Sequence, residues 1–462
     1  MKNDNKFLLI YLLSTLIFFI THYLYLGWDF SAYVLNAKYW FAGGQYFEIY
    51  RAPLVSFLIG CFSIFSWKGA EYLFIAFSSG LFAYSSIKFA QGFKVDKFAY
   101  YLLGLNFFVL IFGVIEGTEL ISLALLQLFL VSIVKGESRS GFYLALACLC
   151  RYNLVIFFPL ILIHKDIKKI LKSVGLFVLA FIPWFIYNGI KYGDIFYSLA
   201  DSIALNVIYR GYMSSSIVWS NFLYAWNFLI PLILIGFVYF IYKEKIDKKY
   251  ILILAFFALS FYSVYDLKSN ILRYFFLLVI PGVFFASYSL KLFSEKVRKI
   301  ILVCFVILTV ISLAYVFFSF SSPDYSEVLN QLEGYGDCKI KSNIWVVLNE
   351  KGIVSEAFPN QELVEYYIAE GHILVYKYDS REPEYIFDEE FISQFPLIYE
   401  SEEYIIIGDG CIPIETVDES YMVRLNSFLY QVHNYTEAEN SCELLFRNNS
   451  LCHGINEIFT SS

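Results

Sequence analysis

The sequence FLLIYLLSTLIFFITHYLYL (residues 7–26), followed at once by GWDFSAY (residues 27–33), decides the fold of this chain. The first stretch has the length of about twenty residues that an α-helix needs to cross the hydrocarbon core of a bilayer. It follows only two lysines and lacks a cleavage site of small residues, which favours a retained membrane helix over a signal peptide.

The composition extends this interpretation to most of the chain. Hydrophobic residues make up 59% and charged residues 16% of the sequence, and the mean hydropathy is +0.60. These values exclude an ordinary water-soluble globular protein. The net charge of −7 comes mainly from acids after residue 322, and no basic stretch suggests a nucleic-acid partner. We expect a polytopic α-helical membrane protein with about 10–12 membrane helices.

Apolar runs of near-spanning length give the predicted helices. They lie at about residues 7–26, 70–89, 98–115, 120–134, 169–190, 217–242, 250–266, 274–294 and 299–320. Residues 53–67 are too few for a comfortable crossing and are predicted to lie at the outer interface. Residues 141–163 are predicted to form two short helices bent around Arg151-Tyr152-Asn153.

The connections between these helices sort by charge. Lysine-rich connections lie at residues 88–97, 135–139, 164–172, 243–249 and 291–299. Basic residues are sparse in the other connections, at residues 28–68, 116–119, 191–216 and 266–273. The positive-inside rule places the first set and the N-terminus in the cytoplasm, and the second set outside.

The C-terminal part changes character near residues 321–323. We expect a membrane domain over residues 1–320 and an extracytoplasmic, soluble α/β domain over residues 321–462. Strand-like runs lie at residues 344–348, 373–376 and 404–407, and residues 360–369 are typical of a helix.

The eight cysteines divide equally between the two parts. Four lie in apolar runs and are predicted to be core residues: Cys61, Cys148, Cys150 and Cys304. Four lie in the tail, an even number compatible with disulfides of open connectivity: Cys338, Cys411, Cys442 and Cys452. Glycosylation sequons at Asn434 and Asn448 fit an external tail.

Charges of both signs gather on the predicted outer face. They are Asp29, Glu48, Arg51, Glu116, Glu119, Arg151, Arg210, Asp266, Lys268 and Arg273. Arg151 lies between two apolar runs, where an unpaired charge is expensive. A carboxylate can take the proton of an attacking hydroxyl, and an arginine fork matches phosphate oxygens. Such a pocket suits the displacement of a lipid-linked phosphate by an acceptor hydroxyl.

Each charge also has an ordinary structural explanation. Asp29 is also explained as a solvated acid in a loop. Arg51 is explained as a side chain that extends its charge to the membrane interface, and Arg273 as an anchor at the membrane boundary. Glu119 fits the first turn of a helix that Thr118 caps. The five histidines are scattered without ligand spacing, so no metal site is expected.

The order of these motifs resembles the polyprenyl-phosphate-sugar-dependent glycosyltransferases of the GT-C superfamily, which includes protein O-mannosyltransferases and aminoarabinose transferases. The matching segments are DFSAY (29–33), YRAPL (50–54), TEL (118–120), CRYN (150–153), PWFIYN (183–188) and RY (273–274). Two positions depart from the family pattern. Ala52 replaces a proline, and Phe30 stands where many relatives carry a second acid.

The resemblance implies an inverting transfer of a mannose-like hexose or related sugar from a dolichyl or other polyprenyl phosphate. It makes Asp29 the general base, and Arg151 and Arg273 the ligands of the donor phosphate. Residues that line or brace the pocket would be Arg51, Glu119, Tyr33, Tyr152 and Asn153. It implies no cofactor, and it leaves a protein, lipid or glycan acceptor open.

Two other functions remain open at this point. The same charges fit a transporter or flippase for a lipid-linked head group, although no internally repeated halves are visible. The third possibility is a non-catalytic membrane scaffold that presents the external domain.

Overall fold

The computed structural model describes residues 2–44, 46–203, 205, 219–244, 247–266, 272–319, 324–359, 361–378 and 383–413. Two compact units divide the chain. The first contains Met1–Phe30, Ala52–Ile195 and Arg210–Ser321, and the second contains Ser31–Arg51, Phe196–Tyr209 and Ser322–Ser462. Several residues of the sequence predictions lie outside the described residues: Arg210, Lys268, Cys442, Cys452, Asn434 and Asn448.

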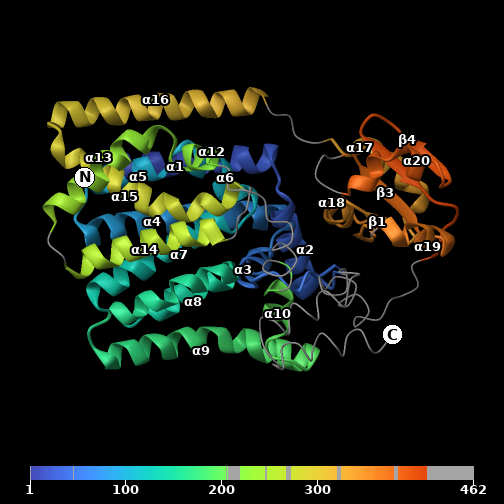
Figure 1. Cartoon of the computed structure of the whole chain (residues 1–462), viewed down its shortest axis with the longest axis horizontal. Coiled ribbons are helices and arrows are strands. Elements are labelled where there is room, and N and C mark those ends of the chain that lie inside the picture. The colour runs from blue at the N-terminus through green and yellow to red at the C-terminus, as the bar shows by residue number, and fades with distance from the viewer. Residues whose placement is uncertain are drawn as a thin grey trace. The chain divides into compact units, whose positions relative to one another are not determined.

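The first unit is a helical bundle (Figure 1). Its helices are α1 (Lys2–Leu24), α3 (Leu54–Phe62), α4 (Trp67–Phe93), α5 (Lys97–Gly104), α6 (Phe107–Ile115), α7 (Glu119–Lys135), α8 (Ser140–Cys150), η1 (Tyr152–Ile163), α9 (Ile167–Tyr192), α12 (Ser220–Trp226), η3 (Asn227–Leu229), α13 (Ile230–Lys243), α14 (Lys248–Asp266), η4 (Leu272–Leu278), α15 (Val279–Ser289), η5 (Leu290–Leu292) and α16 (Glu295–Ser319). Helix α2 (Trp28–Ala42) begins in this unit and continues into the second.

The predicted polytopic helical membrane fold is confirmed. Seven helical stretches within the described residues are long and apolar enough to cross a membrane, and eight if the bent pair α5–α6 counts as one span. The prediction of about 10–12 also counted shorter apolar helices such as α8 and η1. Helix α3 has nine residues, too few to span, as predicted.

Helix α7 lies at the centre of the bundle. It packs between α4 and α8, and only Val134 and Lys135 of its residues are not buried. Helix α9 covers the outer side of α8, and α16 lies on the opposite side of the bundle (Figure 1). Both outer helices expose apolar side chains such as Leu171 and Ile307, as expected of helices that face lipid.

Two helix breaks shape the site described below. The predicted break in residues 141–163 is confirmed, because Arg151 takes an extended backbone (φ −153°, ψ 109°) between α8 and η1. The prediction of one continuous helix over residues 98–115 is wrong. The chain bends by 60° after Gly104, and the Asn106 side chain caps α6 by accepting from the Val109 N–H at 3.1 Å.

The described tail forms a small α/β domain, as predicted. Its helices are α17 (Ser326–Leu332), η6 (Glu333–Tyr335), α18 (Trp345–Glu350), η7 (Gln361–Leu363), α19 (Val364–Ala369), η8 (Glu384–Phe387) and α20 (Glu389–Ile392). Its strands are β1 (Ile340–Ser342), β2 (Ser355–Ala357), β3 (Ile373–Lys377), β4 (Leu397–Glu400) and β5 (Tyr404–Ile407). They form a sheet of order β2-β1-β3-β5-β4 in which β1 is parallel to both β2 and β3, and β5 is antiparallel to β3 and β4. Helix α10 (Tyr197–Ile203) also belongs to the second unit.

The secondary structure predicted for the tail from its apolar runs is correct for three segments and wrong for one. The predicted strands at residues 373–376 and 404–407 are confirmed as β3 and β5, and the helix predicted within 360–369 is confirmed as α19. The strand predicted at 344–348 is wrong, because Trp345–Glu350 forms α18. Strands β1 and β2 are parallel, so their connection must leave the sheet, and a helix fills that crossover.

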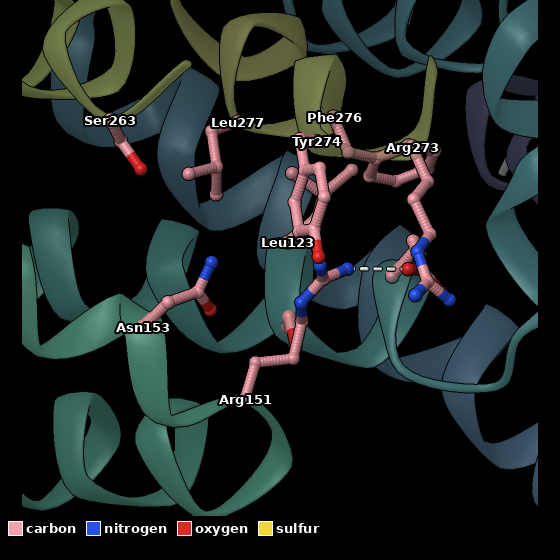
Figure 2. A pocket seen from close by; sticks show the side chains of 10 residues that line it. Leu123, Arg151, Asn153, Ser263, Arg273, Tyr274, Phe276 and Leu277 are labelled. Atoms are coloured by element: carbon pink, nitrogen blue, oxygen red, sulfur yellow. Dashed lines mark hydrogen bonds and ion pairs between the residues drawn. The ribbon is translucent and has the colours of Figure 1, made fainter. Parts of the chain in front are cut away.

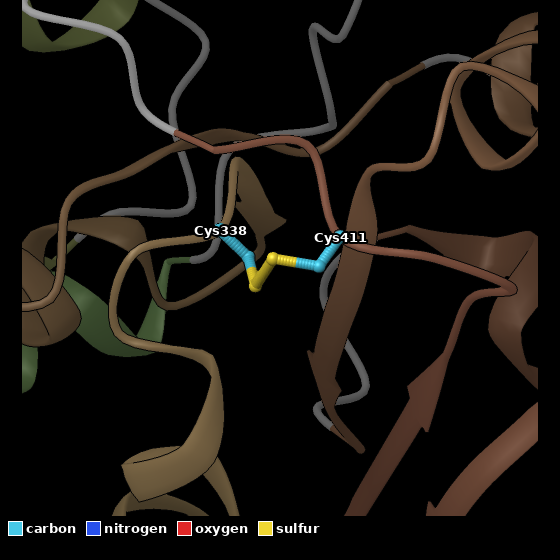
Figure 3. Close-up of a disulfide and its surroundings, with 2 residues drawn as sticks. All are labelled: Cys338 and Cys411. Atoms are coloured by element: carbon cyan, nitrogen blue, oxygen red, sulfur yellow. A yellow bond between two sulfur atoms is a disulfide. The ribbon is translucent and has the colours of Figure 1, made fainter.

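Cysteine pairing closes a covalent loop around this sheet. Cys338 and Cys411 form a disulfide with a Cα–Cα distance of 5.1 Å (Figure 3). Cys148 and Cys150 are buried as predicted, but Cys61 and Cys304 are exposed, so their assignment to the core is wrong. Apolar neighbours in the sequence do not distinguish the interior of a membrane bundle from its outer face.

Replacing both Cys338 and Cys411 by Ser is expected to destabilise the tail. The bond spans 73 residues, and releasing a loop of this size costs about 4 kcal/mol of stability. Limited proteolysis of the full-length protein, read with an antibody against the tail, measures the effect. Cys304→Ser is the control and should leave the digestion rate unchanged; equal rates in both variants would contradict the prediction.

Candidate functional site

An ion pair between a buried carboxylate and a half-buried arginine joins the start of α7 to the break between α8 and η1. Glu119 is the first residue of α7 and is 1% exposed. Its Oε1 accepts from Arg151 Nη1, and its Oε2 accepts from the Thr118 N–H and Oγ–H, both at 3.2 Å. Since both oxygens are bonded, Glu119 holds Arg151 in place and balances its charge.

A second cluster lies where α2 begins. Asp29, in the first turn of α2, forms an ion pair with Arg273 of η4. Glu116, between α6 and α7, has its Oε2 3.7 Å from Arg273 Nη1, and the same oxygen accepts from the Asp29 backbone N–H at 3.0 Å. Arg273 therefore lies between two carboxylates that come from distant parts of the sequence.

Both arginines line one small cavity (Figure 2). The Tyr274 ring lies close to both, with its centroid 5.7 Å from the guanidinium carbon of each. The lining residues are Glu119, Ser122, Leu123, Arg151, Asn153, Ser263, Arg273, Tyr274, Phe276 and Leu277. The cavity volume of about 10 Å³ is room for about one water molecule. The charged groups are therefore closely packed against one another.

Two glycines allow α2 to begin so close to the α6–α7 junction. The Gly27 N–H donates to the Ile115 carbonyl at 3.1 Å, and a Cβ on Gly27 would lie 2.4 Å from that oxygen and 2.8 Å from Glu116 Oε2. Gly117 has a φ of +83°, and a Cβ there would lie 2.9 Å from the Phe30 ring. Neither position tolerates a side chain without a shift of its neighbours.

Phe30 fastens the first turn of α2 to the bundle. Its side chain is fully buried, with ring centroids 4.4 Å from His22 and 6.1 Å from Phe74. The position beside Asp29 is thus an apolar anchor. An acid is nevertheless present beside Asp29 in space, because Glu116 occupies that place.

The environment of Glu116 changes its ionisation. Burial, together with the negative charges of Asp29 and Glu119, raises the pKa of Glu116 to about 7, although the positive charge of Arg273 opposes this. Near neutral pH the cluster therefore exchanges a proton at Glu116. With Glu116 protonated, Asp29, Glu119 and the two arginines balance in charge.

The other predicted site residues fall into two groups. Asn153 lines the cavity, and Tyr152 lies next to it in the chain, its hydroxyl accepting from Trp184 Nε1 at 2.7 Å. Arg51 and Tyr33 belong to the second unit, where Arg51 pairs with Glu48 and its guanidinium carbon lies 5.3 Å from the Tyr33 ring centroid.

Three residues named in the sequence but given no role in the pocket also shape the site: Glu116, Tyr274 and Phe30. The sequence feature that could have indicated the close approach of these segments is the pair of glycines Gly27 and Gly117, each near an acidic residue in the sequence. Within the described residues, no group of three or more His, Cys, Asp or Glu side chains is arranged to hold a metal ion.

Comparison with known proteins identifies a shared fold. No family model matches the chain, and no curated protein sequence does. The crystal structure of ArnT from Cupriavidus metallidurans bound to undecaprenyl phosphate matches with a TM-score of 0.60 and 9% identity, over 87% of this chain and 97% of that chain. The apo state of the same protein matches with a TM-score of 0.57 and 9% identity, over 88% and 98%. The predicted GT-C-like fold is thereby confirmed.

Gly27→Ala is expected to separate α2 from the α6–α7 junction. The added Cβ meets a carbonyl oxygen that cannot move cheaply, so we expect a loss of about 1–3 kcal/mol, typical of overpacking. Thermal unfolding in detergent measures it. Gly175→Ala, in α9 with open space around it, is the matched control and should not destabilise; equal melting temperatures for the two variants would contradict the close approach.

Glu116→Gln is expected to change how stability depends on pH. The folded-state pKa of Glu116, about 7, lies above its ordinary value of 4.5, so the folded protein binds the proton more tightly. Its contribution to stability is present below pH 4.5 and is lost as pH rises to 7. Melting temperatures across this range should fall less steeply in Glu116→Gln than in wild type. Glu365→Gln, an exposed tail carboxyl, should keep the wild-type slope; identical slopes for all three proteins would refute the shift.

Proposed function

We propose that this chain is a membrane glycosyltransferase that moves a sugar from a polyprenyl-phosphate donor to an acceptor hydroxyl. The observation that carries the proposal is two arginine–carboxylate ion pairs, Arg151–Glu119 and Arg273–Asp29, whose arginines line one cavity in a fold similar to ArnT. The similar ArnT structure is bound to undecaprenyl phosphate, which supports a donor of this chemical class.

The two arginines are the proposed ligands of the donor phosphate. A phosphodiester carries one negative charge, and a second develops on the phosphate as the sugar leaves. Arg151 and Arg273 both line the cavity, each with its guanidinium carbon 5.7 Å from the Tyr274 ring centroid. Positive groups at such a site stabilise a leaving group most strongly where water is scarce. Arg273 Nε is buried and has no hydrogen-bond partner among the described residues, so it offers a donor.

Asp29 is the proposed general base. As the acceptor oxygen bonds to the anomeric carbon, the bond from that carbon to the phosphate oxygen breaks with its electron pair, and the acceptor proton moves to Asp29. Attack opposite the leaving phosphate inverts the anomeric centre. The ion pair with Arg273 weakens Asp29 as a base.

In this proposal, donor binding removes the Arg273 ion pair that weakens Asp29 as a base. A cavity of about 10 Å³ cannot admit a phosphate unless an arginine turns away from its carboxylate. If Arg273 turns toward the phosphate, its ion pair with Asp29 breaks while Glu116 stays beside Asp29. Asp29 then becomes more basic at the moment when the donor is present.

The remaining candidates have supporting roles in this proposal. Glu119 holds Arg151, Asn153 and Tyr152 contribute polar groups near the cavity, and Arg51 with Tyr33 braces the chain after α2. The reaction as written needs no cofactor or metal. The sugar is proposed to be a mannose-like hexose or a relative, and the acceptor a protein, lipid or glycan.

The reaction is proposed to occur outside the cytoplasm. The positive-inside rule, applied to the lysine-rich connections, supports a cytoplasmic N-terminus. The Cys338–Cys411 disulfide supports an extracytoplasmic tail, because disulfides persist in oxidising compartments.

Asp29→Asn is expected to reduce sugar transfer by about 10²- to 10⁴-fold, the range for loss of a general base. The assay uses the full-length protein in detergent with polyprenyl-phosphate mannose and related polyprenyl-phosphate sugars, and follows radiolabel into peptide, lipid and glycan acceptors. Asp96→Asn is the matched control, since Asp96 caps α5 and Asn caps equally well.

Two results would overturn the proposal in different ways. Full transfer by Asp29→Asn removes Asp29 as the base and leaves the transferase assignment standing. Absence of transfer by wild type with every polyprenyl-phosphate sugar removes the assignment itself, and movement of the lipid head group across liposomes without transfer would identify a flippase instead.

A further inference from the structure

The C-terminal tail contacts the helix that carries Asp29. Helix α2 begins at Trp28, and from Ser31 onward its residues belong to the second unit together with the tail. Ser31 Oγ donates to Glu350 Oε2 at 2.7 Å, and Glu350 is the last residue of α18. A tail residue therefore bonds to α2 two positions after Asp29, about 3 Å along the helix axis.

The other end of α18 reaches the same helix through a buried chain of hydrogen bonds. Trp345 Nε1 donates to the Tyr46 hydroxyl at 2.9 Å, and that hydroxyl donates to the Glu48 carboxylate. The Asn36 side chain of α2 binds the Glu48 backbone twice, accepting from its N–H at 2.7 Å and donating to its carbonyl at 2.9 Å. Asn36, Tyr46 and Glu48 are all at most 3% exposed.

A buried ion pair makes this connection specific. Arg51 neutralises Glu48 and places its guanidinium carbon 5.3 Å from the Tyr33 ring centroid, and Tyr33 is a residue of α2. Removing one member of a buried pair leaves the other charge uncompensated. The segment after α2 is therefore held in one arrangement between α2 and Trp345.

Helix α18 is in turn fixed to the sheet of the tail. Asn349 Nδ2 donates to the Trp345 carbonyl at 2.8 Å and to the Ser355 carbonyl at 2.7 Å, and Ser355 begins β2. Ser355 Oγ also donates to the Trp345 carbonyl, at 2.9 Å. The sheet, α18 and α2 thus form a continuous chain of bonded elements within the second unit.

We propose that Trp345 and Glu350 are positioning residues for Asp29, which hold α2 from within the second unit so that its first turn presents the Asp29 carboxylate correctly. The link to Asp29 is the continuous backbone of α2. The inference rests on the proposed function, since it assigns the tail a role in orienting the proposed base. An error of about 1 Å in such a group lowers a reaction rate by about 10²-fold.

The test uses the full-length protein with polyprenyl-phosphate mannose as donor. Trp345→Phe removes the N–H and keeps a ring, and Glu350→Ala removes the acceptor of Ser31. Each variant should lower kcat by about 10-fold or more with an unchanged KM for the donor. Hydrogen exchange over residues 28–42 should become faster. In the Asp29→Asn background, neither variant should lower the residual rate further, because the group that they position is gone.

Tyr399→Phe is the matched control. It removes the hydrogen bond from the Tyr399 hydroxyl to Glu327 in the same domain and leaves α18 untouched, so kcat and exchange should stay at wild-type values.

Three results would overturn the inference. Faster exchange with an unchanged kcat would show that α18 only stabilises α2, and a raised KM with an unchanged kcat would assign a role in binding. An additional loss in the Asp29→Asn background would show that α18 acts on something other than Asp29. These failures differ from failure of the proposed function, in which wild type itself transfers no sugar from any polyprenyl-phosphate donor.

Discussion

Everything at the centre of this molecule depends on the need of a buried charge for an opposite charge. Glu119 is almost completely enclosed by the bundle, and its carboxylate is stable there because Arg151 reaches it. Arg151 can reach it because the chain leaves the helical conformation between α8 and η1. The same requirement joins η4 to the start of α2 through Arg273 and Asp29. Four irregular points of an otherwise regular bundle meet in one place because their charges need each other.

This mutual neutralisation explains how a polar site stays stable without substrate. Charges in a small, enclosed cavity interact more strongly than in water, so unpaired arginines there would destabilise the fold. In the proposed function, these carboxylates occupy the place at the arginines that a donor phosphate would take. In the proposed function, substrate binding is consequently an exchange of partners among charged groups already at the site, and the proton on Glu116 adjusts their net charge.

The fold was largely predictable from the sequence, because the length of an apolar run is set by the thickness of the bilayer. The break at Arg151 was also predictable, because a charged residue between two apolar runs is costly to bury in a continuous membrane helix. The bend at Asn106 was not, because both flanking helices are apolar and a single capping side chain causes it. The strand assigned to residues 344–348 failed because a short apolar run fits a buried helix as well as a strand.

The site itself was only partly predictable. Single residues such as Asp29, Arg151 and Arg273 stand out by their chemistry, but their partners depend on tertiary structure. Glu116 lies 87 residues from Asp29 in the chain, and nothing in one sequence pairs them. Arg51 belongs to the same series of motifs, yet it pairs with Glu48 in the second unit. The order of the motifs therefore identifies candidate site residues more reliably than it predicts which of them are in contact.

The anchoring of Phe30 has a consequence for how relatives of this chain can be found. Because that position is filled by a ring packed against His22 and Phe74, the second acid comes from a separate segment, beside a glycine with a left-handed backbone. A search pattern built on two adjacent acids after the first membrane helix would overlook such proteins. A pattern that pairs a glycine and an acid after the first helix with an acid and a glycine before α7 would retain them. The recognisable signature of this site is thus divided between two loops of the chain.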